Sequence, residues 1–228
     1  MTTALLALET ATDACSAALW RDGETLERRV VAPREHAARL LPMVEGLLAE
    51  AGMPGTGLDA VAFGRGPGSF TGLRIAAGVA QGLALAWGLP VVPVSTLAAL
   101  AQDAIEDGAG AVLAALDARM GEVYWGAFRA GEEGLAVPAG AERVCPPDAV
   151  EFPGPGPWVG AGPGWEAHGG ALRARTGGAL ARVEPGRLPW AGRVARLAAA
   201  ALARGEAVPP EEALPVYLRS RVADAPRG

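Results

Sequence analysis

Short apolar runs along the chain predict strands of a sheet. The run ALLALETAT (residues 4–12) has the length of a buried strand. The next stretch, CSAALWRDGETLERRVV (15–31), alternates around the dipeptide Asp22-Gly23, which favours a two-residue hairpin turn. We therefore predict a three-stranded meander at the start of the chain. Two later runs, LDAVAFG (58–64) and LPVVPVS (89–95), predict further strands.

Helical spacing is found between these strands. In HAARLLPMVEGLLAEA (36–51) the apolar residues Leu40, Leu41, Val44, Leu47 and Leu48 recur at helical intervals, and Gly52 should end the helix. Ser69 is the expected N-cap of a helix that continues through Ala86. A further helix is predicted over residues 96–105, so helices alternate with strands in this part of the chain.

The beginning of the chain has a counterpart near its middle. The stretch LLALETATDACSAALWRDGE from Leu5 resembles VLAALDARMGEVYWGAFRAGE from Val112. At one constant offset, Leu5, Ala7, Leu8 and Glu9 align with Leu113, Ala115, Leu116 and Asp117. Each copy predicts a buried strand that ends in a carboxylate, followed by a turn and a second strand. The chain is therefore expected to form two lobes built on one plan.

The two expected lobes comprise residues 1–106 and 107–228. After about residue 136 the pattern weakens, and PPDAVEFPGPGPWVGAGPGW (146–165) is expected to be a loop region. A last helix over about 190–204 is expected to pack back on the first lobe. This order of elements fits an α/β class, the two-lobe actin-like (ribonuclease H-like) fold with mixed sheets flanked by helices, in which the lobes face a nucleotide cleft. This step is an analogy, and a fold does not establish a function.

Net charge, cysteine spacing and the polarity of the longest apolar segment argue against several classes of function. The chain has 228 residues, a formal net charge of -5, and arginine as its only strongly basic residue type, which argues against broad capture of nucleic acid by this chain alone. Cys15 and Cys145 have no CxxC spacing, and the N-terminus has no basic region, so we expect a cytoplasmic protein. The segment 70–87 carries Arg74 and Gln81, which disfavours insertion into a membrane.

The glycine-rich stretch GRGPGSFTG (64–72) raises the question of phosphate binding. It lacks the lysine of a P-loop, and Pro67 removes a backbone donor. We favour a structural interpretation, in which the glycines allow a sharp turn into a closely packed helix, and direct phosphate binding is the alternative. In that helix Gly72, Ala76, Ala80 and Ala84 form a stripe of small residues. Either another helix of the chain or a helix of a second protein could lie against it, with Leu40, Leu47 and Leu48 completing an apolar face.

Two carboxylates and two histidines are the other candidates for chemistry. Glu9 and Asp117 could hold the waters of a Mg²⁺ ion between the lobes, or they could cap strand ends, and both interpretations stay open. His36 and His168 lack the spacing of a helical metal-binding pair. We interpret His36 as a surface or interface residue.

Together these stretches resemble one family. The matching pieces are LALETATDACSAALW, REHAARLLPMVEGLL, AFGRGPGSFTGLRIAAGVAQGLALAWGLPVVPVSTL, LAALDARMGEVYW and PVYLRSRVA, in the family's order. They are similar to TsaB (YeaZ-like) proteins, subunits of the bacterial machinery that makes threonylcarbamoyladenosine (t6A) at position 37 of tRNAs reading ANN codons. The resemblance implies a cytoplasmic actin-like scaffold without catalysis of its own, which binds and activates the related catalytic subunit TsaD.

The resemblance also implies partners and ligands. The ATPase TsaE joins the complex, and TsaC is a further candidate partner. Alone the chain is expected to form a homodimer, and tRNA is reached only through the complex. No tightly bound cofactor is expected, with ATP or ADP only at partner interfaces. TsaD-like proteins carry a metal-binding pair of histidines where this chain has His36 and then Leu40, so no metal site and no catalytic residue are expected.

The residues implied at the sites follow from the matching motifs. The implied partner or dimer interface comprises His36, Arg39, Leu40, Met43, Leu47, Gly72, Ile75, Ala76, Val79 and Ala80. The implied vestigial nucleotide or metal cleft comprises Glu9, Thr10 and Asp117. Many relatives have Asp where this chain has Glu9, which weakens the case for tight binding of a magnesium nucleotide. The alternative functions are an actin-like ATPase or phosphotransferase and, third, a metal-dependent glycoprotein endopeptidase.

Overall fold

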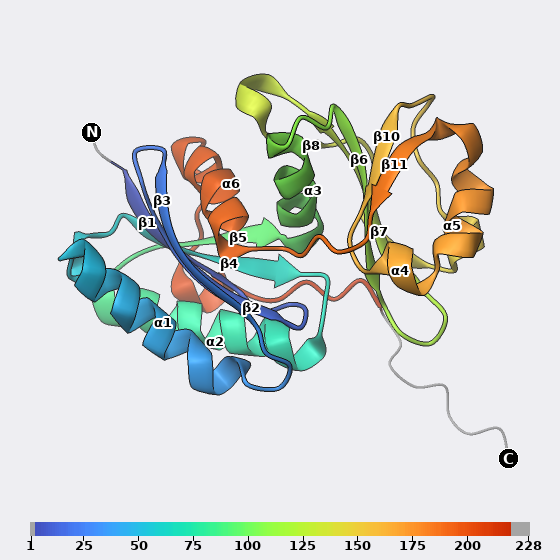
Figure 1. The fold of residues 1–228 in the computed structure, drawn as a ribbon. Helices are drawn as coiled ribbons and strands as arrows, with labels where there is room; N and C mark the ends of the chain where they lie inside the picture. Colours follow the sequence, from blue (N-terminus) through green and yellow to red (C-terminus); the bar gives the residue numbers. More distant parts are fainter. Residues whose placement is uncertain (1–2, 220–228) are drawn as a thin grey trace, which may run out of the picture.

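The first lobe is built on a five-stranded mixed sheet. The computed structural model describes residues 3–219, and Figure 1 shows the sheet covered by helices on both faces. Its strands are β1 (Ala4–Glu9), β2 (Ala14–Arg21), β3 (Glu24–Val31), β4 (Ala60–Gly66) and β5 (Val91–Ser95). They lie in the order β3-β2-β1-β4-β5, with β1, β2 and β3 antiparallel and β1, β4 and β5 parallel. The predicted meander and hairpin are confirmed.

Both faces of the first sheet are buried because apolar residues fill nearly every position of β1. Leu6 and Leu8 face α1 (His36–Ala51) and α2 (Phe70–Trp87), whereas Leu5 and Ala7 face α6 (Ala191–Ala203). An unbroken apolar strand is typical of a sheet covered on both sides. Helix α6 therefore completes the first lobe.

The second lobe repeats this plan. Its strands are β6 (Ala111–Asp117), β7 (Val123–Ala130), β8 (Ala136–Pro138), β9 (Arg143–Cys145), β10 (Trp158–Ala161) and β11 (Leu180–Glu184). The order β11-β10-β6-β7-β8 matches β5-β4-β1-β2-β3. The pairs β6–β7 and β7–β8 are antiparallel, and β6–β10 and β10–β11 are parallel. Its remaining helices are α3 (Thr96–Glu106), α4 (Gly164–Ala167) and α5 (Gly169–Thr176). Short 3-10 helices occur at Gly55–Gly57, Glu132–Gly134, Pro147–Ala149, Gly177–Ala179 and Pro210–Glu212. The internal repeat is confirmed, as is the two-lobe fold class.

The expectation of a plain loop region over residues 146–165 was wrong. This segment contains β10, which pairs with β6 in the centre of the second sheet and buries Trp158 and Val159. A four-residue strand among prolines and glycines is too short to show periodicity. The sheet supplies the pairing that the local sequence does not signal.

The chain passes between the lobes twice, first through α3 and then through the segment that joins β11 to α6. Ion pairs hold this second crossing in place. The Arg187 guanidinium pairs with Asp103 at 2.6 Å and Asp107 at 2.7 Å, both on or just after α3. Arg193 of α6 also pairs with Asp103, at 3.0 Å. These contacts, of which those to Asp103 are largely buried, hold α6 and α3 together where the chain passes from one lobe to the other. No helix within residues 3–219 is long and apolar enough to cross a membrane.

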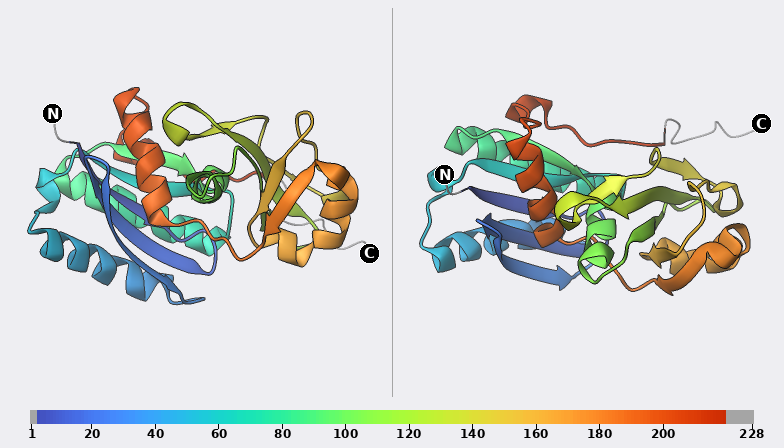
Figure 2. Two further views of the ribbon diagram at one scale, coloured as in Figure 1. Left: turned by 45° about the horizontal axis from the view of Figure 1, so that its top comes forward. Right: turned by 90° about the horizontal axis from the view of Figure 1, so that it is seen from above.

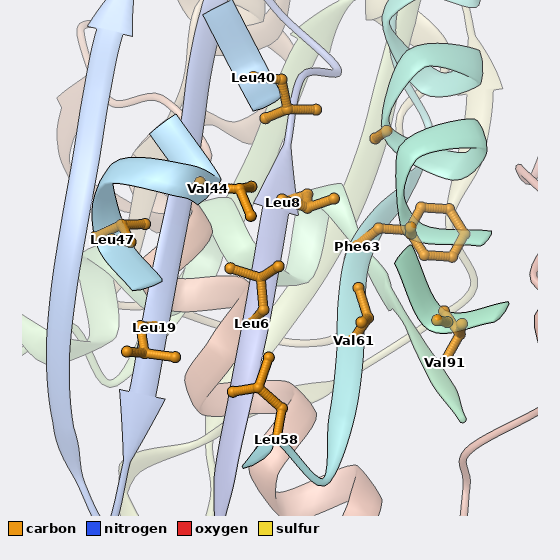
Figure 3. Close-up of a cluster of buried hydrophobic side chains, with 14 of the residues drawn as sticks. Leu6, Leu8, Leu19, Leu40, Val44, Leu47, Leu58, Val61, Phe63 and Val91 are labelled. Atoms are coloured by element: carbon orange, nitrogen blue, oxygen red, sulfur yellow. The ribbon is translucent and has the colours of Figure 1, made fainter. Parts of the chain in front are cut away.

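The core beneath α1 is formed by large aliphatic side chains. Figure 3 shows Leu40, Val44 and Leu47 pointing from α1 toward Leu6 and Leu8 of β1. The three α1 residues recur at helical spacing and are almost entirely inaccessible to solvent. Their burial orients α1, and with it the outward-facing side chains of the same helix.

The two adjacent leucines of α1 provide a test of this orientation. Leu40→Ala should lower the free energy of unfolding by about 2–5 kcal/mol, because it leaves a cavity in a packed core. Leu41 is 43% exposed, so Leu41→Ala should cost less than about 1 kcal/mol. Urea unfolding of both variants measures the difference, and equal losses would show that α1 is rotated from the orientation described.

Candidate functional site

Glu9 lies inside the protein at the end of β1. Its Oε1 accepts the Ala11 N–H at 2.6 Å, and its Oε2 lies 3.3 Å from Oγ1 of Thr96, the first residue of α3. The carboxyl group packs over Gly64, where an added Cβ would lie 1.9 Å from Oε2. Glu9 is fully buried, so its carboxyl group does not project into an open space between the lobes.

Burial changes the acidity of Glu9. Removal from water raises its pKa to about 7, and the hydrogen bonds from Ala11 and Thr96 only partly oppose this effect. The side chain therefore exchanges a proton near neutral pH. A neutral, internally bonded carboxyl group is a poorer ligand for Mg²⁺ than an ionised one.

The turn after β1 is covered by the start of α2. Thr10 Oγ1 donates to the Gly72 carbonyl at 2.8 Å, and the Ser69 N–H donates to the Ala11 carbonyl at 2.7 Å. A Cβ on Gly72 would lie 2.0 Å from the Thr10 carbonyl oxygen. The glycine-rich stretch thus brings one backbone against another, as the structural interpretation expected. Ser69 also caps α2 as predicted, accepting from the Gly72 N–H at 3.4 Å.

His36 belongs to the same turn and is not the surface residue that the sequence suggested. Its side chain is buried at the start of α1. Nε2 lies 2.9 Å from the Thr12 carbonyl and 3.2 Å from the Ala14 carbonyl. The histidine thereby ties α1 to the segment between β1 and β2. A polar residue at a helix start gives no sequence signal of a partner so far along the chain.

Asp117 occupies the equivalent position in the second lobe but has different partners. Its Oδ1 accepts the Arg119 N–H at 2.8 Å and lies 3.4 Å from His168 Nε2. Its Oδ2 pairs with Arg119 at 3.1 Å. Glu9 and Asp117 therefore have separate sets of hydrogen-bonding partners. Within residues 3–219, no three His, Cys, Asp or Glu side chains are grouped so that they could hold a metal ion.

The small-residue stripe of α2 faces the chain's own sheet. Gly72, Ala76, Ala80 and Ala84 are buried, and the three alanines pack in the same cluster as Phe63 of β4. The stripe lets α2 lie close to the sheet, so it is not a bare surface for a second protein. Of the other residues implied at the interface, Leu40 and Leu47 are also buried, because they fill the core under α1.

The solvent-facing sides of α1 and α2 are formed by neighbours of the buried stripe. Arg39 is exposed, and Met43, Ile75 and Val79 are half-buried. Sequence reasoning missed five exposed residues of this surface, which are Leu41, Phe70 (52% exposed), Gly78, Gly82 and Leu85 (76% exposed). We call these residues, together with Arg39, Met43, Ile75 and Val79, the outer face of α1 and α2. A helical register anchored on Leu40 and Ala76 as buried positions would have identified them.

Comparison with known proteins assigns the family. A family model described as TsaD, tRNA N6-adenosine threonylcarbamoyltransferase, matches residues 30–161. Over 223 residues the chain is 45% identical to the Escherichia coli K12 protein named tRNA threonylcarbamoyladenosine biosynthesis protein TsaB, with 96% of each chain covered. The chain belongs to the TsaB family.

Further TsaB-family relatives agree in sequence and structure. The Haemophilus influenzae protein of the same name is 54% identical over 122 residues, which cover 53% of this chain and 52% of that protein. A solved structure titled YeaZ from Pseudomonas aeruginosa superimposes with a TM-score of 0.88 at 50% identity, covering 95% of this chain and all of that one. The last residues of the matching stretch PVYLRSRVA, 220–223, lie outside the described residues.

The buried carboxyl group of Glu9 should make stability depend on pH. Its pKa is about 7 in the folded protein and 4.5 ordinarily, so its contribution is fully present below pH 4.5 and is lost as pH rises through 7. Glu9→Gln keeps the acceptor for Ala11 and removes the ionisation. The variant should gain on the order of 3 kcal/mol over the wild type at pH 8 relative to pH 4.5. Urea unfolding at both pH values measures this difference, and a pH-independent difference would contradict it.

Two glycines of α2 form a matched pair for testing the contact with the turn. Gly72→Ala should lower the free energy of unfolding by at least about 2 kcal/mol, because its Cβ meets a backbone carbonyl that cannot move away easily. Gly78→Ala meets no atom within 4 Å and should raise stability by about 0.5–1 kcal/mol through helix propensity. Thermal unfolding compares the two, and a stabilising Gly72→Ala would show that the contact is loose.

Proposed function

We propose that this chain is a non-catalytic subunit in t6A biosynthesis that binds and activates TsaD. In this role TsaD transfers the threonylcarbamoyl group from its adenylate to N6 of adenosine 37, in tRNAs that read ANN codons. The proposal draws on the E. coli relative, which covers nearly the full length of both chains and is named for this pathway. The match of residues 30–161 to the TsaD model is consistent with a partner that is related to this chain.

The contact between the first turn of α2 and the turn after β1 is the observation that carries the non-catalytic role. In a two-lobe ATPase, the turn after the first strand of each lobe would have to accept phosphate through free backbone N–H groups. Here the Ala11 N–H donates to Glu9, and the Ala11 carbonyl accepts from Ser69. Gly72 lies directly against Thr10. The chain's own groups fill this position, which favours a scaffold over a phosphotransferase.

The outer face of α1 and α2 is the proposed binding surface for TsaD. It combines exposed apolar side chains, such as Leu41 and Leu85, with an exposed arginine, Arg39. Gly78 and Gly82 have no side chains, so a second helix can approach the middle of α2 closely. We propose that the same face closes on a second copy when TsaD is absent. TsaE, and TsaC if it takes part, would join through the assembled complex, and tRNA would be reached indirectly.

A charge at the centre of this face should prevent binding. Gly78→Arg places a large cation on the open side of α2 without disturbing the core, because no atom lies within 4 Å of the added Cβ. We expect co-elution with TsaD in size-exclusion chromatography to be lost, with affinity at least about 100-fold weaker. Ala76→Arg is unsuitable, because Ala76 is buried and the variant would unfold.

The matched control is Gly170→Arg, which introduces the same residue at an open glycine of α5 in the second lobe. It should bind TsaD as the wild type does. Undiminished binding of a folded Gly78→Arg variant would refute the proposed face. Calorimetry with Mg-ATP tests the alternative function, an actin-like ATPase or phosphotransferase. Saturable binding of Mg-ATP, with turnover that is lost in Glu9→Ala, would establish an ATPase.

A further inference from the structure

After α6 the chain returns across the first lobe and reaches the second. We call residues 208–219 the C-terminal strap; it runs from the first lobe toward the second in Figures 1 and 2. Val208 pairs with Val91 of β5 through two backbone hydrogen bonds of 2.8 Å. Further along, Ala213 is buried and accepts from Gln81 Nε2 at 3.2 Å, and the Val216 N–H donates to the Arg65 carbonyl at 2.7 Å.

The end of the strap contacts both lobes. The Tyr217 hydroxyl accepts from Arg74 Nε at 3.2 Å, and its ring lies 5.6 Å from the ring of Phe70, so it is held on α2. Two residues later, Arg219 forms an ion pair with Glu122 of the second lobe. Both side chains of this pair are largely shielded from solvent, with 20% and 32% exposed. The strap therefore spans the two lobes independently of the covalent crossings.

The turn that Arg219 contacts has an unusual backbone. Arg119 and Met120 have φ values of 62° and 55°, and Gly121 follows at 78°. Left-handed conformations cost non-glycine residues of order 1 kcal/mol or more, and glycine or asparagine would fit this turn better. The Arg219 guanidinium lies 3.5 Å from the Arg119 carbonyl and 3.4 Å from Met120 Sδ. The two residues held in the costly conformation are thus the ones that receive the strap.

A second contact joins the lobes through the start of α3. The Ser95 hydroxyl, at the end of β5, donates to the carboxyl group of Glu142, which lies between β8 and β9 of the second lobe. Ser95 Oγ also accepts the Ala98 N–H at 3.1 Å and so caps α3. This contact lies on a segment that crosses between the lobes, whereas the Arg219–Glu122 pair joins the lobes through the strap.

We propose that the C-terminal strap is a clasp that sets the angle between the two lobes, with the Arg219–Glu122 pair as its releasable end. When this pair opens, the turn at 119–122 loses its partner, and the second lobe can rotate about the crossings at α3 and at residues 185–190. The pair is suited to release because it is one ion pair, and water still reaches part of each side chain. The strap up to Ala213 stays attached, to β5 through the Val208–Val91 backbone bonds and to α2 through the Gln81 side chain.

The test breaks the ion pair from the second-lobe side and measures the distance between the lobes. Spin labels on cysteines that replace exposed Glu45 of α1 and Arg173 of α5, in a Cys145→Ser background, report this distance by pulsed electron resonance. Cys15 is fully buried and remains unlabelled. We expect one narrow distance distribution for the otherwise unaltered chain and a shifted or broadened one for Glu122→Gln.

The control is Glu206→Gln, which breaks the exposed Arg204–Glu206 pair within the first lobe and should leave the distribution unchanged. Hydrogen exchange of the Val216 amide should rise about fivefold in Glu122→Gln and stay unchanged in the control. An unchanged lobe-to-lobe distribution in folded Glu122→Gln would overturn the clasp, even if the strap amides exchange faster. The labelled chain is diluted with an excess of unlabelled chain, so that only distances within one copy are measured even if two copies associate. The outcome is therefore independent of the proposed binding to TsaD or to a second copy.

Discussion

The close approach of α2 to the turn after β1 is the constraint on which the first lobe depends. Gly72 rests on the Thr10 carbonyl, and the Thr10 hydroxyl is bonded to the Gly72 carbonyl. This contact fixes the start of α2 against β1, and the small residues that follow let the rest of the helix settle onto the sheet. The start of α1 is tied to the same turn through His36. The relative placement of the two outer helices therefore follows from one short segment of backbone.

The same segment shows how the chain's own groups occupy the turn after the first strand. Glu9 stands at the end of the first strand, where a catalytic carboxylate would be expected from the fold. Its oxygens are instead engaged by Ala11 and by Thr96 of α3, and burial favours its neutral form. The Glu9 carboxyl group thus connects the end of β1 to α3, the helix between the lobes.

Much of the architecture could be predicted from the sequence, because the decisive signals are local. The Asp22-Gly23 hairpin, the Ser69 cap and the repeat of β1 in β6 each depend on a few adjacent residues. What the small-residue stripe of α2 packs against could not be predicted, because such a stripe suits either the chain's own sheet or a helix of a second protein. The partners of His36 and of Arg219 depend on segments distant in sequence. The strand at 158–161 depends on pairing with β6, which no local pattern encodes.

The position of α6 has a consequence for the order in which the chain can fold during synthesis. The sheet of the first lobe is formed by residues 4–95, but its Leu5 and Ala7 face is covered by a helix that begins only at residue 191. On the ribosome, this apolar face must stay uncovered while the entire second lobe is translated. The N-terminal lobe therefore cannot mature as a separate unit, because the helix that closes it begins about five-sixths of the way along the chain.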